Sequence, residues 1–420
     1  MADRTTEWHQ SNTIYPMETI YLDNNATTPP APEVLEAMDR AWAEAWANPS
    51  SVHRLGQAAR YHLELARRQV AGLVGCRESE LVFTSGGTES NNTALMGVLA
   101  RPSPKPRYLV TTPIEHSAIR EPAEALEDFG VEIVQIPVDT TQTIEPGALE
   151  ETLRTHVPAG ATVLVSVQWA NNETGAIQPV EQLREVVRQF ATGALRGDGQ
   201  RSRAVFHTDA TQAVGKVPVD AGAAGVDLMS FSSHKFHGPK GVGGLYMRSG
   251  LRMAPWQRGG PQERDRRGGT ENVVGIVGAG VAAERAAERI ADPERLASWA
   301  AMRDRFEQRM LEHITDAVVH LPSGPRLWNT TNIGFPRLEA EAILLTLSER
   351  GVCASAGAAC SSGSLDPSPV LLAMGIDRAV AHGSLRFSSS HLTTAEELDR
   401  AAEIITEVVA RIRGTMAEPA

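Results

Sequence analysis

The sequence has few cysteines and no long apolar run, and each deficit excludes a class of protein. Three cysteines occur in 420 residues, Cys76, Cys353 and Cys360, and none forms a Cys-x-x-Cys pair. A disulfide framework is therefore excluded, and a reducing cytoplasm is the expected compartment. No apolar run approaches the roughly 18–20 residues that a membrane-spanning helix needs.

Positive charge is also in deficit. The formal net charge is −11, which argues against a general nucleic-acid surface. The first residues, Met1 to Glu7, are polar and lack the apolar core of a secretory leader. The histidines include no His-x-x-x-His pair in a helical context, so no metal site is predicted. We expect neither a membrane nor a nucleic acid as a partner.

Apolar runs alternate with polar turns and amphipathic stretches along most of the chain, which is typical of an α/β fold with a mostly parallel sheet. Several runs are almost wholly apolar, as strands covered on both faces should be. The predicted strands are Leu81–Thr84, Tyr108–Thr111, Val131–Ile136, Val163–Gln168, Ala204–His207, Leu228–Ser232 and Gly244–Met247. The predicted helices include Ala58–Leu73, Glu89–Leu99, Val180–Phe190 and Trp299–His313.

The length of the chain predicts two domains. Beyond about residue 290 the pattern changes to long helices and short strands. We expect a large domain over residues 30–285 and a smaller α+β domain over residues 286–420, with residues 1–29 packed on the smaller one. The segment Ala191–Arg203, rich in Gly, Arg and Ser, predicts an extended surface loop.

Polar side chains follow five of the predicted strands at the point where each strand ends. Ligands of open parallel sheets bind beyond the carboxyl ends of the strands, so these five groups are expected to meet. They are Ser85–Ser90, Glu115–His116, Asn171–Glu173, Asp209 with Gln212, and Ser233–Lys235.

The first group, Ser85-Gly86-Gly87-Thr88, ends a strand and opens a helix, where free N–H groups and the helix dipole favour a phosphate. A simple capped turn is the alternative, and no Walker A lysine follows. A second pattern, Gly278-Ala279-Gly280, lies in a predicted helix and is interpreted as helix packing.

Lys235 directly follows an apolar strand, where desolvation would lower the pKa of its amine and prepare it to form a Schiff base. A surface lysine is the alternative, and Lys240 is the rival candidate. Asp209 could pair with a protonated pyridine nitrogen or serve as a helix cap or structural ion pair. His116 could stack on a ring and carry a proton, or could be an ordinary loop histidine.

Cys360 lies in a stretch of small and polar residues without periodicity, Ala354–Ser364, which predicts an exposed, mobile loop. Because a free cysteine normally prefers burial, one displayed on such a loop is a candidate nucleophile. Cys76 and Cys353 lie beside apolar segments and are interpreted as structural.

Together these residues resemble the NifS/IscS-like cysteine desulfurases, a group within the class V aminotransferase family of fold-type I pyridoxal-phosphate (PLP) enzymes. The resemblance extends from about Tyr21 to Leu398. Its motifs are Tyr21–Pro29, Asn48–His53, Thr84–Asn92, Asn171–Glu173, His207–Gln212, Ser233–Lys235 and Ser355–Ser364.

The resemblance implies roles for individual residues. Lys235 would carry PLP covalently, Asp209 would pair with the pyridine nitrogen, Gln212 with the ring hydroxyl, and His116 would stack on the ring. Gly87, Thr88, Ser232 and His234 would hold the phosphate. Thr270 would reach the cofactor of a second subunit, which implies a homodimer. Asn172 and Arg386 would hold the substrate carboxylate, a task that suits the planar fork of arginine.

The implied activity converts L-cysteine to L-alanine, with Cys360 receiving the sulfur as a persulfide, Lys235 moving the α-proton and His116 acting as acid or base. A sulfur-acceptor protein, such as an iron–sulfur scaffold, is the implied partner. The alternatives are a selenocysteine lyase, another class V transaminase, or a non-catalytic sulfur-relay protein. A transaminase has no need of Cys360.

The chain departs from the usual sequence pattern of these desulfurases at two positions. Glycine is frequent at the position of Asp265, and arginine is frequent at the position of His391.

Overall fold

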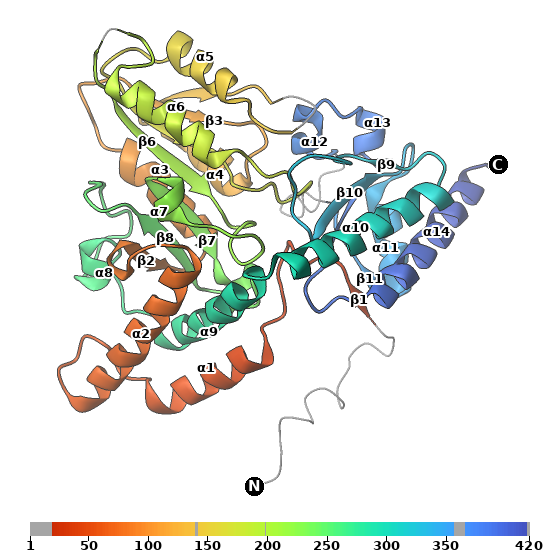
Figure 1. The fold of residues 1–420 in the computed structure, drawn as a ribbon, viewed down its shortest axis with the longest axis horizontal. Helices are drawn as coiled ribbons and strands as arrows, with labels where there is room; N and C mark the ends of the chain where they lie inside the picture. Colours follow the sequence, from red (N-terminus) through yellow and green to blue (C-terminus); the bar gives the residue numbers. More distant parts are fainter. Residues whose placement is uncertain (1–18, 139–141, 198, 357–365, 418–420) are drawn as a thin grey trace.

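The core of the computed structural model is a seven-stranded sheet in the order β2-β8-β7-β6-β5-β3-β4 (Figure 1). The structure describes residues 19–417 except 139–141, 198 and 357–365. Strand β8 runs antiparallel to β2 and β7, and the other neighbours are parallel, which confirms the mostly parallel sheet. The strands are β2 (Leu81–Thr84), β3 (Arg107–Thr111), β4 (Glu132–Gln135), β5 (Thr162–Ser166), β6 (Arg203–Asp209), β7 (Leu228–Ser232) and β8 (Gly243–Met247).

Helices cover both faces of this sheet, because alternate residues of its strands point to opposite sides. Val163 and Val165 of β5 pack into the larger apolar core, while Leu164 between them packs into the core on the other face. The first face carries α2 (Arg54–Leu73), α5 (Pro146–His156), α6 (Val180–Thr192) and α9 (Val273–Ile290), and the second carries α3 (Gly87–Leu99) and α4 (Ser117–Glu127). Helix α1 (Pro32–Glu44) packs on α9.

A separate apolar core is built mainly from the C-terminal third of the chain. It combines residues far apart in sequence, such as Ile20, Leu22, Phe306 and Phe387. Its strands form an antiparallel sheet, β12-β10-β9, and a parallel pair, β1-β11. The elements are β1 (Ile20–Tyr21), β9 (Val318–Val319), β10 (Thr330–Gly334), β11 (Val352–Cys353), β12 (Ser384–Ser388), α10 (Pro293–His313), α11 (Ala340–Glu349) and α14 (Ala395–Ala417). The remaining helices are short: α7 (Ala221–Ala224), α8 (Gln262–Asp265), α12 (Pro369–Ala373) and α13 (Arg378–Ala381).

Each predicted strand and helix lies inside an observed element or within two residues of its ends. The observed α2, α3 and α10 begin two to six residues earlier than predicted and end at the predicted residue. The glycine pair Gly278 and Gly280 lies inside α9, where a Cβ on Gly280 would stand 2.7 Å from the Cα of Ala66 on α2. That close approach of two helices confirms the packing interpretation. Among the described residues, no helix combines the length and apolarity that a bilayer crossing requires.

Candidate active site

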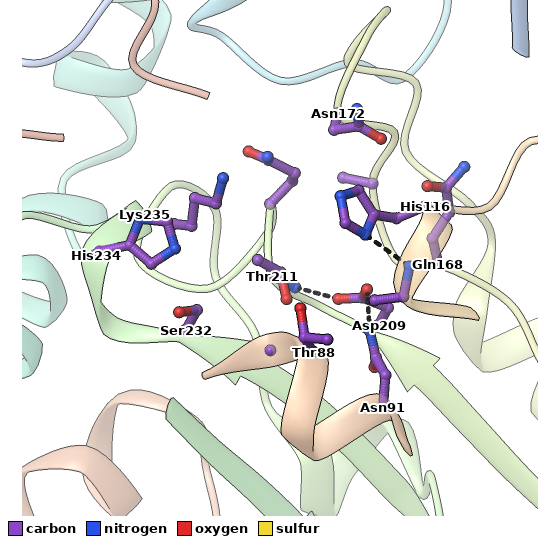
Figure 2. Close-up of a pocket in the computed structure, with 14 residues that line it drawn as sticks. Thr88, Asn91, His116, Gln168, Asn172, Asp209, Thr211, Ser232, His234 and Lys235 are labelled. Atoms are coloured by element: carbon purple, nitrogen blue, oxygen red, sulfur yellow. Dashed lines mark hydrogen bonds between the residues drawn. The ribbon is translucent and has the colours of Figure 1, made fainter. Parts of the chain in front are cut away.

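A cavity opens at the carboxyl edge of the large sheet (Figure 2). Segments that follow five strands line it, so the structure brings together all five polar groups found in the sequence. The lining residues are Gly87, Thr88 and Asn91 after β2, His116 and Ala118 after β3, Gln168, Ala170 and Asn172 after β5, Asp209 at the end of β6 with Thr211 and Gln212 after it, and Ser232 at the end of β7 with His234 and Lys235 after it.

Asp209 is the last residue of β6, and its carboxylate is held by two donors. The side-chain amide of Asn91, on α3, donates to Oδ2 at 2.7 Å, and the backbone N–H of Thr211 donates to Oδ1 at 2.9 Å, as Figure 2 shows. Only 7% of Asp209 is exposed. A buried carboxylate fixed in this way is suited to a cationic ligand atom in the cavity.

Lys235 ends a short 3-10 turn, Ser233–Lys235, that directly follows β7. Its Nζ donates to two backbone carbonyls of the N-terminal segment, Asn25 O at 2.6 Å and Ala26 O at 2.7 Å. The neighbouring His234 has its pKa lowered to about 4 by burial and by the nearby lysines, so its ring is neutral near pH 7. Lys240, the rival candidate, is exposed and does not line the cavity.

The N-terminus of α3 faces the cavity through Gly87 and Thr88. A Cβ added to Gly87 would stand 2.8 Å from Oγ1 of Thr211, so any larger residue here would displace that hydroxyl. That Oγ1 is buried and has no hydrogen-bond partner among the described residues. Free N–H groups at a helix start and an unsatisfied hydroxyl together form a cradle for phosphate.

His116 caps the start of α4, where its Nδ1 accepts from the N–H of Ala118 at 3.0 Å. In a neutral ring the proton is therefore on Nε2. Figure 2 shows His116 and Lys235 on opposite sides of the cavity.

Glu115, the residue before His116, is buried under the site and accepts from Thr112 Oγ1 at 2.8 Å and from Gln168 N at 3.0 Å. Burial raises the pKa of Glu115 to about 8, despite these two donors.

Arg386, on β12, is buried, and it approaches the site from the C-terminal core. One guanidinium nitrogen donates to Asn172 O at 3.1 Å, and another pairs with Asp23 Oδ1 at 2.6 Å. Arg386 is thus linked to the cavity through Asn172, although it is not itself a lining residue. Asp23 is a partner of Arg386 that the sequence did not indicate.

The remaining predicted site residues are Thr270 and Cys360. Thr270 is exposed and lies outside the lining set. Cys360 falls in residues 357–365, outside the described residues, so its predicted role stays a prediction.

The structure adds residues that the sequence alone did not single out. Asn91, Gln168 and Thr211 line the cavity, and Asn91 and Thr211 were inside or beside quoted motifs. Asn25 and Lys216 contact site residues from behind: Asn25 O accepts from Gln212 Nε2 at 3.0 Å, and Lys216 Nζ donates to Asn25 Oδ1 at 2.8 Å.

The cavity fits pyridoxal phosphate at each of its chemical groups. The phosphate cradle lies at Gly87 and Thr211, a fixed carboxylate is available at Asp209 for a protonated ring nitrogen, and an amine is available at Lys235 for the aldehyde. An α/β sheet that brings a lysine, an aspartate and a helix N-terminus to its carboxyl edge is characteristic of the fold-type I PLP enzymes.

The comparisons define the group within that class. The chain belongs to the class-V aminotransferase family, whose model matches residues 20–401, and its cofactor is PLP. A curated relative from Trichormus variabilis, named cysteine desulfurase 2, is 45% identical over 94% of both chains. The cysteine desulfurase IscS of Dictyoglomus turgidum is 42% identical over 94% of this chain and 95% of its own. A solved NifS-like protein superposes with a TM-score of 0.82 at 35% identity, covering 94% of this chain and 100% of the other.

Proposed function

We propose that this chain is a cysteine desulfurase that converts L-cysteine to L-alanine and transfers the sulfur to Cys360. The observation that carries the proposal is the cavity in which Lys235, Asp209 and the start of α3 converge. The relatives named cysteine desulfurase, at 40–45% identity over 94% of the chain, support the same substrate.

Bound PLP supplies an electron sink that acidifies the substrate α-carbon and weakens the bond from the β-carbon to sulfur. Lys235 would carry the cofactor through its Nζ, and the same amine would move the α-proton of the substrate. Asp209, held by Asn91 and Thr211, keeps a positive charge on the ring nitrogen. Arg386 and Asn172 hold the substrate carboxylate, and His116 moves the proton of the substrate thiol through Nε2.

The sulfur step balances without an external oxidant or reductant. The thiolate of Cys360 attacks the substrate sulfur, an S–S bond forms and the C–S bond breaks. The electron pair of the broken bond returns to the substrate carbon, which gains a proton and becomes the methyl group of alanine. The products are alanine and a persulfide on Cys360, which a sulfur-acceptor protein, such as an iron–sulfur scaffold, then receives.

The cofactor assignment is tested by visible absorption of the purified protein. Covalently held PLP makes the wild type yellow, and we expect Lys235→Ala to lose the covalent band. Lys240→Ala, a control that removes the exposed lysine five residues later, should keep it. A covalent band that survives in Lys235→Ala would refute the assignment of the cofactor to this amine.

The sulfur step is tested by sulfide release from L-cysteine in the presence of a thiol reductant. Cys360→Ser should keep the yellow cofactor and lose sulfide release, whereas Cys353→Ser, which removes a partly buried cysteine, should keep both. Unchanged turnover of L-cysteine in Cys360→Ser would favour a transaminase or a lyase. Selenocysteine offered beside cysteine separates the lyase alternative, because a selenocysteine lyase would release selenide and leave cysteine unused.

We also propose a homodimer. Of the thirteen large exposed apolar side chains among the described residues, seven lie on α1, α2 and the loop between them, including Trp42 at 65% and Trp46 at 63% exposure. An apolar surface of this kind marks a protein interface. Arg67 of α2 pairs with Glu263 at 2.7 Å, which ties the segment leading to Thr270 to the same side of the molecule. This placement is compatible with Thr270 reaching the phosphate of a partner's cofactor.

The expected domain division, residues 30–285 against 286–420 with 1–29, stays a proposal that the two separate apolar cores support. We place the enzyme in the cytoplasm, because a thiol that accepts sulfur must be kept reduced between turnovers.

A further inference from the structure

Behind the cavity lies a second lysine that the proposed mechanism does not use. Lys216, in the turn after β6, is only 4% exposed, and its Nζ donates to Gln212 Oε1 at 2.5 Å and to Asn25 Oδ1 at 2.8 Å. Its backbone carbonyl accepts from the indole N–H of Trp328 at 2.8 Å, which anchors the turn to the C-terminal part of the chain. Burying a lysine amine is costly, so its placement here requires a reason.

The contacts of Lys216 close a ring of hydrogen bonds around Asn25. The carbonyl of Asn25 accepts from Lys235 Nζ at 2.6 Å and from Gln212 Nε2 at 3.0 Å, while its side-chain oxygen accepts from Lys216. The side-chain amide of Asn25 donates to Thr330 Oγ1 at 2.9 Å and to Asn172 O at 3.1 Å. Asn25 is therefore fixed, and it can hold its two partners in one geometry.

These hydrogen bonds determine whether the oxygen or the NH₂ group of the Gln212 amide is available to a ligand in the cavity. An amide can present either its oxygen or its NH₂ group, and nothing in Gln212 itself selects between them. Lys216 Nζ donates to the Gln212 oxygen, and Asn25 O, which can only accept, lies beside Gln212 Nε2, so the two contacts together fix which end of the amide is which. Nε2 then has one hydrogen on Asn25 O, and its second hydrogen is left for a ligand in the cavity.

We propose that Lys216 is a positioning residue that locks the Gln212 amide as a hydrogen-bond donor toward the ring oxygen of PLP. The inference rests on the proposed function, because it needs the cofactor on Lys235. A donor at that oxygen stabilises its anionic form and eases loss of the proton shared between the ring oxygen and the Lys235 nitrogen.

The charges around the amine act in the same direction. Burial lowers the pKa of Lys216 well below its ordinary value, and the cationic groups of Lys235 and Arg386 lower it further. Any positive charge that Lys216 retains also opposes protonation of the neighbouring Lys235 nitrogen. The other titratable groups that face the cavity are Asp209, His116 and His234.

The test is the pH titration of the visible absorption band of the holoenzyme. Loss of one hydrogen bond to the ring oxygen should raise the midpoint by roughly 0.5–1 pH unit. We expect this upward shift in Lys216→Met, which keeps the length of the side chain and removes its donors, and also in Gln212→Leu. Lys240→Met, which removes an exposed lysine with no bond to Gln212, should leave the midpoint unchanged.

The double variant Lys216→Met/Gln212→Leu distinguishes positioning from a direct charge effect. If Lys216 acts through Gln212, the double variant has the midpoint of Gln212→Leu alone. Additive shifts, or an unchanged midpoint in Lys216→Met, would overturn the proposal.

Two further outcomes are separated by the same measurement. If Lys216→Met does not fold, Gln212→Leu carries the test, because an unchanged midpoint in that variant shows that the amide is no donor to the ring. Failure of the proposed function is recognised differently, since the wild type would then lack a titrating visible band, or Lys235→Ala would keep it.

Discussion

Glu115 should make the enzyme less stable as the pH rises, and replacing it by glutamine should remove that dependence. Burial raises the pKa of this carboxyl from 4.5 to about 8, and the negative charge of Asp209 contributes in the same direction. Below about pH 4.5 the group is protonated in the folded and unfolded states alike. Between pH 4.5 and 8 only the folded state keeps the proton, so the stability from this group is lost as the pH rises through this window.

The magnitude follows from the size of this window. Each pKa unit corresponds to about 1.36 kcal/mol, so between pH 5.5 and 8 the wild type should lose about 3 kcal/mol that Glu115→Gln does not lose. Unfolding entropy of about 2.1 cal/mol/K per residue converts this difference to about 3 °C in Tm for a chain of this length. The amide oxygen of glutamine can still accept from Thr112 and Gln168. Any constant cost of burying the new NH₂ group cancels in a comparison between two pH values.

The assay is the difference in Tm between Glu115→Gln and wild type, measured by thermal unfolding from pH 5.5 to 9. We expect this difference to increase by about 3 °C toward pH 8 and then to level off. Glu124→Gln, which changes an exposed glutamate on α4, is the matched control and should give a constant difference. A constant difference for Glu115→Gln as well would mean that the buried carboxyl is ionised across the whole range, which would refute the reasoning.

Four further outcomes are expected. Asp209→Ala should weaken PLP binding about 10- to 100-fold in an absorbance titration, because a charge-assisted hydrogen bond to the ring nitrogen contributes about 1.5–3 kcal/mol; unchanged affinity would contradict the pairing. Trp42→Glu combined with Trp46→Glu should convert a dimer to monomers in sedimentation velocity, and a persistent dimer would place the interface elsewhere. Ser368→Ala should lower the free energy of unfolding by about 2–3 kcal/mol in urea, because Ser368 caps α12 and donates to the buried Glu173 at 2.6 Å; Ser368→Thr should recover most of the loss. Asp265→Gly should raise stability by about 1 kcal/mol and Asp265→Ala should lower it, since Asp265 has a left-handed φ of 63°; equal effects of the two would argue against backbone strain.

The apolar pattern of the sequence predicted the positions of the sheet strands well, because a strand covered on both faces consists almost entirely of apolar residues. Leu81–Thr84 and Leu228–Ser232 agree with β2 and β7 residue for residue. The site at the carboxyl edge was predictable for the same reason, since the residue after each strand lies at a known edge of the sheet.

Residues that complete the site from a distance were not predictable in this way. Asn25 contacts Gln212 across 187 residues of sequence and Lys216 across 191. Lys216 shows no periodicity or motif of its own that reveals burial. Its importance depends on which segments meet in three dimensions, and a single sequence does not state that.

The interleaving of the two chain ends has a consequence for biosynthesis. Leu22, Asn24 and Asn25 bond to Ser388, about 364 residues away, and Asn25 in turn holds Lys235. A nascent polypeptide on the ribosome therefore cannot assemble its reaction centre until translation has passed Ser388, because the carbonyl that receives the Lys235 amine is itself anchored there. Products that terminate before Ser388 should therefore lack the fixed carbonyl that receives the Lys235 amine.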